Sequence, residues 1–431
     1  MKKATFIFLA VLVVVVLYFH AHALANGVLM NCIGPASTGR GGTNIAHADN
    51  SAMIHDNPAA LANMDGAQAG LSLDFITLPM EYTDPSNDES AKDTLSTLPS
   101  CAYMKPYGTL PMGIGIGFYN PAGFSADYDL LHPYGEQRYY SKASLSKVLL
   151  GAGMKINNAL SLGIAMGAAY SKLELELPYT FQTGTLAGTP ALIDLEGDKW
   201  IFTWNVGAQW DISENTVLGL TYRCQDQFSM SGDLDIDIPP IGLPDTSAHY
   251  KARFTLTWPQ SVGAGLWHRM NDNHKLSCDI VWVNWSSAFD EWTLKMSESD
   301  NAGYDAAAGT TPQDTLPLNW KDSYSFRLGY EYLLNPKSAS RKDTIRFGYI
   351  YDKSPVPDST LTPLVPGILT HMLTIGYGRE LGNWALNCAY LYSFKSEQSV
   401  GTSEIQGGDF DSSSVAISTH FFSLGIGYKF N

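Results

Sequence analysis

The sequence lacks the short motifs that mark common hydrolases and metalloenzymes. It contains no G-x-S-x-G elbow, no H-E-x-x-H pair and no C-x-x-C pair. Its ten histidines are scattered, and His47 and His55 each stand close to an aspartate, Asp49 and Asp56. Such short-range pairs are usually solvated or cap a helix. We therefore expect no enzyme, no metal site and no cofactor.

Cysteine is scarce, and the five cysteines form no closely spaced pair: Cys32, Cys101, Cys224, Cys278 and Cys388. An odd number in an oxidising compartment leaves at least one thiol free. A disulfide bridge between Cys32 and Cys101 is one possibility. The spacing of the cysteines does not determine which of them pair.

Positive charge is also in deficit. The 27 lysines and arginines are outnumbered by 42 aspartates and glutamates, which gives a formal net charge of −15. An acidic surface repels phosphate backbones, so we expect no nucleic acid as a partner.

Long apolar runs are absent beyond the N-terminus. The one such run, residues 6–19, follows Lys2 and Lys3 and precedes the small residues Ala23-Leu24-Ala25. It is shorter than the roughly 20 residues that a membrane-spanning helix needs. We interpret residues 1–25 as a cleaved export signal. A lipid anchor on Cys32 is disfavoured, because Asn31 stands where a small residue is required.

What the sequence does contain is a long series of alternating segments. From residue 66 onward apolar and polar or small residues alternate with period two, which predicts strands. Short turns, such as Asn157-Asn158, alternate with long loops, among them residues 178–198, 236–248 and 296–317. An outer-membrane barrel sorts its connections in this way, and a soluble sandwich does not. We predict an all-β fold, an antiparallel transmembrane barrel of about 14 strands.

The aromatic content supports this prediction, since 23 tyrosines, 10 tryptophans and 18 phenylalanines suit two interfacial girdles. The last strand alternates most clearly. Its apolar set is expected to face lipid, with small residues facing the lumen: Phe422, Leu424, Ile426, Tyr428 and Phe430. One long strand near residues 249–269 is expected to be interrupted at Pro259.

Residues 34–61 interrupt the alternation before it starts. Gly39, Gly41 and Gly42 permit φ > 0, and Asn57-Pro58 removes a backbone donor. A chain so interrupted needs a wall to pack against, so we predict a compact plug, or hatch, inside the barrel. The predicted domains are a signal peptide (1–25), a hatch (26–65) and a transmembrane β-barrel (66–431).

Five stretches carry a resemblance to a known family. They are Gly39-Arg40-Gly41-Gly42 with Asn57-Pro58-Ala59, Ile156-Asn157-Asn158, Leu220-Thr221-Tyr222-Arg223, Trp320-Lys321-Asp322-Ser323-Tyr324 and Ser354-Pro355-Val356-Pro357. These five stretches occur in the order found in the FadL/TodX family of outer-membrane channels for long-chain fatty acids and aromatic hydrocarbons, and the chain resembles that family. The resemblance implies a monomer in the outer membrane of a diderm bacterium, inserted by the barrel assembly machinery and surrounded by outer-membrane lipids.

The resemblance also implies an inner pocket beside the mature N-terminus. Val28, Met30 and Ile33 are its predicted apolar residues, with simple hatch packing as the alternative. Lys321 is the predicted headgroup contact, because strand alternation places it with Arg327 in the lumen. A pairing of Lys321 with a neighbouring carboxylate is the alternative.

An outer capture groove is expected where apolar residues occupy predicted loops. Its residues are Phe181, Leu186, Leu192, Ile193, Ile238, Ile241 and Leu243. Packing of the two loops against each other is the alternative.

The resemblance also implies a lateral opening at a kink in the third strand, residues 112–119. The proline that follows could supply this kink, because it cannot donate to the ladder. The residues of this opening are Phe118, Tyr119, Asn120, Pro121 and Gly123. An ordinary strand end is the alternative.

The resemblance implies passive diffusion of a hydrophobic cargo, with a long-chain fatty acid expected first. Positions that supply basic residues in the fatty-acid carriers fall on Leu177 and Leu316. Uncharged hydrocarbons or other lipids therefore remain an alternative cargo. A surface adhesin or structural barrel that transports nothing is the alternative from a different functional class.

Overall fold

The computed structural model describes residues 28–92, 95–133, 135–237, 247–338, 341–405, 407–408 and 410–430. The predicted export signal lies outside the described residues, and so do Ile238, Ile241 and Leu243 of the predicted capture groove. Within the described ranges, no helix is long and apolar enough to cross a membrane.

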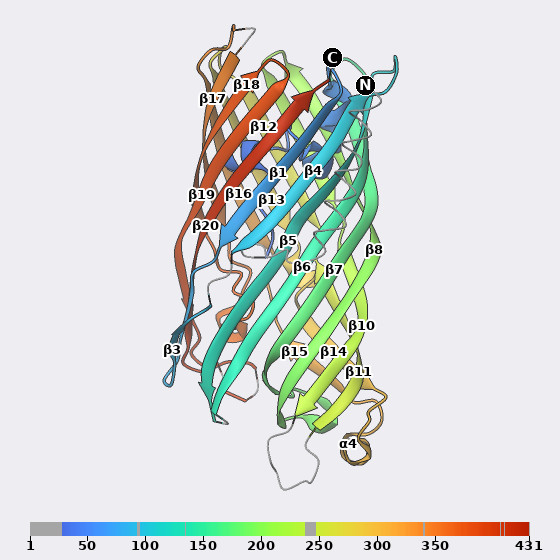
Figure 1. The fold of residues 1–431 in the computed structure, drawn as a ribbon, viewed down its shortest axis with the longest axis vertical. Helices are drawn as coiled ribbons and strands as arrows, with labels where there is room; N and C mark the ends of the chain where they lie inside the picture. The colour runs from blue at the N-terminus through green and yellow to red at the C-terminus, as the bar shows by residue number, and fades with distance from the viewer. Residues whose placement is uncertain are drawn as a thin grey trace.

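The described strands form one antiparallel sheet that closes on itself through the pairing of β1 with β20 (Figure 1). The strands are β1 (Gln68–Thr77), β2 (Met80–Thr83), β3 (Asp88–Ser90), β4 (Ser96–Pro106), β5 (Met112–His132), β6 (Gly135–Lys155), β7 (Leu160–Thr180), β8 (Pro190–Ser213), β9 (Thr216–Arg223), β10 (Asp226–Asp237), β11 (Ser247–Trp258), β12 (Ser261–Arg269), β13 (His274–Val283), β14 (Glu291–Ser297), β15 (Gln313–Pro317), β16 (Ser323–Leu333), β17 (Arg341–Asp352), β18 (His371–Leu381), β19 (Trp384–Ser399) and β20 (Ser414–Lys429). The helices are α2 (Pro35–Gly39), α3 (Met53–Asp56), η1 (Pro58–Asn63), η2 (Gly184–Leu186), η3 (Trp285–Ser287), α4 (Ala302–Ala308) and η4 (Asp358–Thr360).

The barrel wall consists of 14 antiparallel strands, which confirms the predicted fold. Some wall strands are interrupted and carry two labels: β9 with β10, β11 with β12, β13 with β14, and β15 with β16. The break between β11 and β12 contains Pro259, as predicted, because proline cannot donate to the ladder. β2 and β3 pair with each other in the connection from β1 to β4.

Short and long connections lie at opposite ends of the barrel (Figure 1). Turns 107–111, 156–159, 214–215, 270–273 and 382–383 lie at the end where β20 finishes, and the longer connections 298–312 and 353–370 lie at the other. In outer-membrane barrels the short turns face the periplasm. The predicted sorting of connections is therefore confirmed except between β5 and β6, which are only two residues apart at the end with the long connections.

Alternation along each strand separates a lipid face from a lumen face. In β20, Phe422 and Leu424 are 43% and 42% exposed, whereas Ser423 between them is fully buried. Apolar side chains thus point outward where the surrounding solvent is hydrocarbon, and small polar ones point inward.

Two predicted loops contain strands. β7 continues to Thr180 and β8 begins at Pro190, and the predicted loop 296–317 contains α4 and β15. Leu192 and Ile193 therefore lie on β8 and not in a loop. Ile193 and Leu195 are buried while Asp194 and Glu196 are exposed. In this part of β8, beyond the lipid-facing band of the barrel, the alternation continues but acidic residues point outward. These outward acidic residues made the sequence of the segment resemble a loop.

The third predicted strand is also longer than expected. β5 does not end at Tyr119 but continues to His132, because a bulge between Tyr119 and Ala122 restores its pairing with β6. Only the ladder with β4 stops, after Phe118 pairs with Cys101. At the proline the ladder with β4 ends, whereas the ladder with β6 is only offset by the bulge.

Candidate functional site

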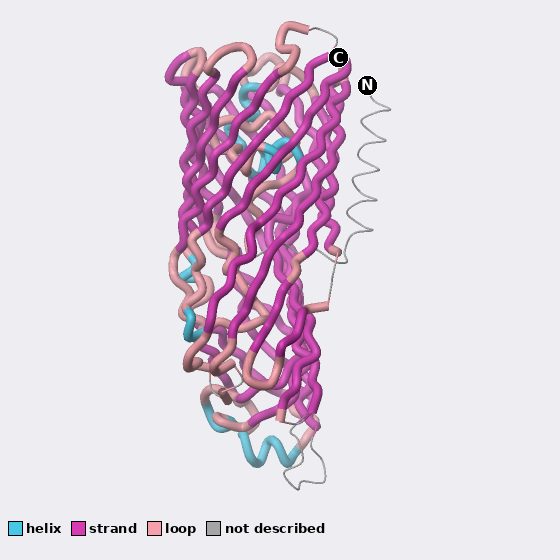
Figure 2. The backbone as a smooth tube through the Cα atoms, turned by 90° about the vertical axis from the view of Figure 1, so that its left-hand side faces the viewer, coloured by secondary structure: helices cyan, strands magenta, loops and turns pink. Residues whose placement is uncertain are grey.

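The described part of the hatch, residues 28–65, lies inside the barrel toward the end with the short turns (Figure 2). Its helices α2, α3 and η1 are enclosed by the strands in that view. The predicted hatch residues are all buried: Gly39, Arg40, Gly41, Gly42, Asn57, Pro58 and Ala59.

Asn57 fixes the turn between α3 and η1. Its Oδ1 accepts from the backbone N–H of Ala59 at 3.1 Å, while its Nδ2 donates to the carbonyls of Ile45 at 2.7 Å and Ala208 of β8 at 3.1 Å. Gly163 of β7 lets the hatch reach the wall, because a Cβ there would lie 2.2 Å from the backbone nitrogen of Ala59. The turn at Asn57 therefore packs closely against the barrel wall.

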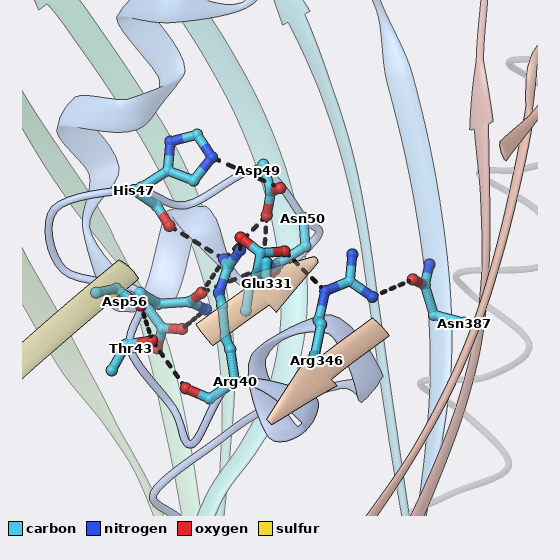
Figure 3. Close-up of polar contacts among 12 residues, drawn as sticks. Arg40, Thr43, His47, Asp49, Asn50, Asp56, Glu331, Arg346 and Asn387 are labelled. Atoms are coloured by element: carbon cyan, nitrogen blue, oxygen red, sulfur yellow. Dashed lines mark hydrogen bonds and ion pairs between the residues drawn. The ribbon is translucent and has the colours of Figure 1, made fainter. Parts of the chain in front are cut away.

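Arg40 is the centre of a buried polar network between hatch and wall (Figure 3). Its Nη2 lies 2.9 Å from Asp49 Oδ1, and its Nη1 lies 3.4 Å from Glu331 Oε1 on β16. Glu331 also pairs with Arg346 of β17 at 2.9 Å, and Arg346 donates to Asn387 of β19 at 3.0 Å. The hatch is thus tied to three wall strands by charge-assisted hydrogen bonds.

The charges around Arg40 keep both Arg40 and Asp49 ionised. Burial would lower the pKa of the guanidinium, but Asp49 and Glu331 hold it above its ordinary value. Burial would likewise raise the pKa of Asp49, but Arg40 and His47 hold it well below its usual range. Both groups remain charged across physiological pH.

A second network surrounds Asp56 at the end of α3. The carboxylate accepts from Asn44 Nδ2 at 2.5 Å and from His55 Nδ1 at 2.9 Å, and Arg223 of β9 lies 3.2 Å away. Burial, followed by the charge of Arg223, lowers the pKa of His55 to about 4. His55 is therefore a neutral donor to an ionised Asp56, which makes it a structural partner.

The N-terminal tip, residues 28–31, pairs with the irregular part of β5. Met30 donates its backbone N–H to Pro121 at 2.9 Å, and Gly123 donates to Val28 at 3.1 Å. An inner cavity opens beside this contact and is lined by the tip, by Pro121 and by Ala122. Val28 and Met30 of the predicted pocket lie at this cavity. Ile33 lies at a separate cavity on the other side of the hatch.

The inner cavity is lined by charged as well as apolar groups. Lys147 lies 2.5 Å from Asp226, and Arg327 donates to the side chain and the carbonyl of Asn31, both at 2.9 Å. Lys353 also lines the cavity, and within the described residues no carboxylate lies within ion-pair distance of its side chain.

Lys321 lies elsewhere than predicted. It precedes β16, which begins at Ser323, so strand alternation does not determine its direction. It is exposed and does not line the inner cavity. Arg327 does lie in the lumen, as alternation predicts. Lys353, by contrast, lines the inner cavity.

An outer cavity lies between the extended strands and the folded loops of the long-loop end. Its lining includes Leu177, Ile193, Phe289, Leu316 and Trp320, and no charged side chain among the described residues lines it. Ile193 of the predicted groove thus contacts a cavity. Phe181 and Leu186 are buried in the surrounding core, and Leu192 is half-buried.

The predicted lateral opening coincides with an interrupted seam between β4 and β5. Residues 96–100 of β4 pair with β1 but have no ladder partner on β5. The amide of Asn120 closes this gap by donating to the carbonyl of Pro99 at 2.8 Å. Phe118, Tyr119, Asn120, Pro121 and Gly123 are all buried, so the seam is closed in this structure.

The five cysteines are free, so the possible bridge between Cys32 and Cys101 is not formed. Burial raises the pKa of the Cys32 thiol to about 12, which keeps it protonated and inert. The described residues contain no cluster of His, Cys, Asp and Glu suited to a metal ion.

Sequence reasoning missed Asn31, Glu331, Arg346 and Lys353. Nothing near Asn31 marks it. Glu331 and Arg346 carried a usable signal, because charged residues at lumen-facing strand positions need buried partners. Lys353 directly precedes the Ser354-Pro355 motif and was overlooked there.

Comparisons with known proteins agree with this architecture. A family model for outer membrane protein transport proteins (OMPP1/FadL/TodX) matches residues 16–430. The long-chain fatty acid transport protein of Escherichia coli O6:H1 is 23% identical, covering 78% of this chain and 78% of that protein. The crystal structure of a Pseudomonas aeruginosa FadL homologue covers 94% of this chain and 100% of its own, at 17% identity and a TM-score of 0.76. The Ralstonia pickettii toluene transporter TbuX covers 93% and 99%, at 20% identity and a TM-score of 0.70. The chain therefore belongs to the OMPP1/FadL/TodX family, whose members are non-enzymatic outer-membrane proteins of Gram-negative bacteria that transport hydrophobic compounds.

Proposed function

We propose that this protein admits long-chain fatty acids by passive diffusion. Cargo enters the outer cavity, passes to the inner cavity and leaves sideways through the seam between β4 and β5. The carrying observation is the succession of an apolar cavity, a partly charged cavity and an interrupted strand ladder. In this proposal the chain divides into a signal peptide (1–25), a hatch (26–65) and a barrel (66–431) and acts as a monomer.

The hatch explains why a hydrophobic cargo needs this route. A lumen filled by buried, hydrogen-bonded backbone leaves no aqueous bore for ordinary solutes. A hydrophobic chain gains about 0.8 kcal/mol for each CH₂ that it buries, so apolar cavities supply a favourable path.

Lys353 supports a carboxylate cargo. It lines the inner cavity beside the tip residues Val28 and Met30, which would contact the acyl chain. A charge-assisted hydrogen bond to a carboxylate contributes about 1.5–3 kcal/mol. Lys353→Gln should therefore weaken binding of hexadecanoic acid at least about tenfold and leave binding of hexadecane unchanged, as measured by titration of the purified protein.

The second candidate cargo is an uncharged hydrocarbon, and the outer cavity favours it. Leu177 and Leu316 line that cavity, and the carboxylate of buried Asp314 accepts from Tyr179 at its edge. A second carboxylate would be repelled there. The related transporter TbuX is described as carrying toluene, which is consistent with this alternative.

Uptake separates these candidates. A strain without the gene should lose accumulation of radiolabelled hexadecanoic acid, and a plasmid copy should restore it. If only hexadecane or toluene accumulation falls, the cargo is a hydrocarbon. If no hydrophobic compound is affected but surface attachment is impaired, the protein is an adhesin and the proposal is wrong.

A further inference from the structure

The outer and inner cavities are separated by a thin partition. Trp320 lines the outer cavity and Trp285 the inner one, with ring centroids 5.0 Å apart. The 364–369 segment, in the connection between β17 and β18, belongs to the same partition. Leu364 lines the outer cavity, whereas Gly367 lines the inner one.

Gly367 is the point where the partition meets the hatch. A Cβ on Gly367 would lie 2.9 Å from Cη2 of Trp320 and 3.3 Å from Cγ2 of Val28. Trp320 and Val28 are 2% and 5% exposed. The ring and the N-terminal tip therefore approach each other across a residue that has no side chain.

The 364–369 segment is held in place by its own bonds. Ser141 of β6 donates to the carbonyl of Leu364 at 2.5 Å. Inside the segment Gly367 donates to Val365 and Ile368 to Pro366, both at 2.9 Å. Leu364, Ile368 and Leu369 are buried. This connection is folded into the core and does not extend into solvent.

Passage between the cavities requires movement of packed side chains. Phe289 and Trp320 pack in a tilted arrangement with ring centroids 4.7 Å apart, and neither residue is more than 5% exposed. A bulky group costs more to insert than a slender chain, because a close-packed interior yields only by side-chain shifts.

We propose that Trp320 and Gly367 form the specificity-determining constriction between the two cavities. The constriction admits unbranched alkyl chains and excludes fused aromatic groups. Because a Cβ on Gly367 would already meet Trp320 and Val28, a chain passes only when the Trp320 ring shifts. Because Trp320 and Val28 lie on either side of Gly367, cargo that displaces the ring also pushes on the tip. This inference rests on the proposed transport function and adds a limit on cargo width.

The test measures uptake of two probes, hexadecanoic acid and a decanoic acid that carries a terminal pyrene. Gly367→Ala should reduce hexadecanoic acid uptake about fivefold or more. Adding Trp320→Phe should restore most of it, because the smaller ring frees the space that the Cβ takes. Trp320→Ala alone should raise pyrene probe uptake relative to hexadecanoic acid. Gly401→Ala is the matched control, since no atom lies within 4 Å of that Cβ position.

The amount of folded protein in the outer membrane is measured for each variant, and uptake is normalised to it. Wild-type uptake of both probes by Gly367→Ala would overturn the constriction. A normalised loss that Trp320→Phe does not restore would also overturn it, because the added Cβ would then not act through the Trp320 ring. Failure of the proposed function is distinguishable, since the wild-type strain would then take up no more probe than the deletion strain.

Discussion

Arg40 carries the strongest residue-scale connection between the hatch and the barrel wall. Its side chain is 1% exposed and faces Asp49 and Glu331. Breaking a buried ion pair leaves an uncompensated charge and costs about 3–5 kcal/mol. Arg40→Ala should therefore lower the thermal unfolding midpoint of the detergent-solubilised protein by several degrees.

Lys337→Ala is the control for this loss of a cation. Lys337 is 87% exposed and lies 3.5 Å from Asp272, and exposed pairs contribute about 0–1 kcal/mol. Equal midpoints for Arg40→Ala and the wild type would contradict the role assigned to the buried network.

The protonation of His55 should make the stability of the folded protein depend on pH. Its pKa is lowered from 6.5 to about 4 in the folded protein. Between these values the unfolded chain binds a proton on His55 and the folded chain does not, so this residue destabilises the fold as pH falls. The full effect is roughly 3 kcal/mol below pH 4.

His55→Gln keeps a donor for Asp56 but cannot titrate. Its unfolding midpoint should fall less between pH 7 and pH 4.5 than that of the wild type. His268→Gln, on an exposed residue of β12, should behave like the wild type. A wild-type pH dependence in His55→Gln would show that this imidazole is not the group responsible.

Residue-scale prediction from the sequence was uneven for a physical reason. Arg40 and Asn57 were found because they sit in a glycine- and proline-rich motif that dictates a compact backbone. Lys353 was missed and Lys321 was misplaced, because alternation determines the direction of a side chain only inside a strand. Lys321 precedes β16, and Lys353 follows β17.

The contact between the hatch and the inner wall is an element-scale feature. A Cβ at Gly163 of β7 would lie 2.2 Å from both Pro58 C and Ala59 N. Gly163→Ala should therefore displace η1 and increase hydrogen–deuterium exchange across residues 58–63. Gly66→Ala is the control, because the nearest atom to its Cβ position is 3.7 Å away. Unchanged exchange in Gly163→Ala would contradict this packing.

The seam between β4 and β5 is the second element-scale feature. Pro99 lies on the unpaired edge of β4 and Pro121 on the edge of β5 that the N-terminal tip covers, and neither has a backbone N–H to donate. The double variant Pro99→Ala, Pro121→Ala restores both donors and should tighten the seam. We expect uptake of hexadecanoic acid to fall several-fold at equal protein level. Pro85→Ala, in the exposed connection between β2 and β3, should leave uptake unchanged. Normal uptake by the double variant would rule out this exit.

Element types were predictable from the sequence, but several ends were not. Period-two alternation is local, so β20 and the break at Pro259 were read correctly. The extended parts of β7 and β8 were read as loops, because their outer faces carry acidic residues in place of lipid-facing apolar ones. The continuation of β5 depends on pairing with β6, which no local pattern shows.

At the scale of the whole molecule, a closed wall and an internal segment together determine what can cross. The ladders close through β1 and β20, and the hatch fills the lumen between the inner cavity and the short-turn end. The described hatch is buried against the wall, whereas the outer cavity offers an apolar surface to hydrophobic molecules. Sequence predicted this arrangement because sorted loops and an interrupted N-terminal segment are global features of the chain.

The most direct test compares two solutes in cells with and without the protein. The rates of accumulation of radiolabelled hexadecanoic acid and of sucrose in the periplasm and cell interior are measured side by side. The account predicts that the protein accelerates the fatty acid several-fold and leaves sucrose unchanged. Acceleration of sucrose, or of neither solute, would contradict it.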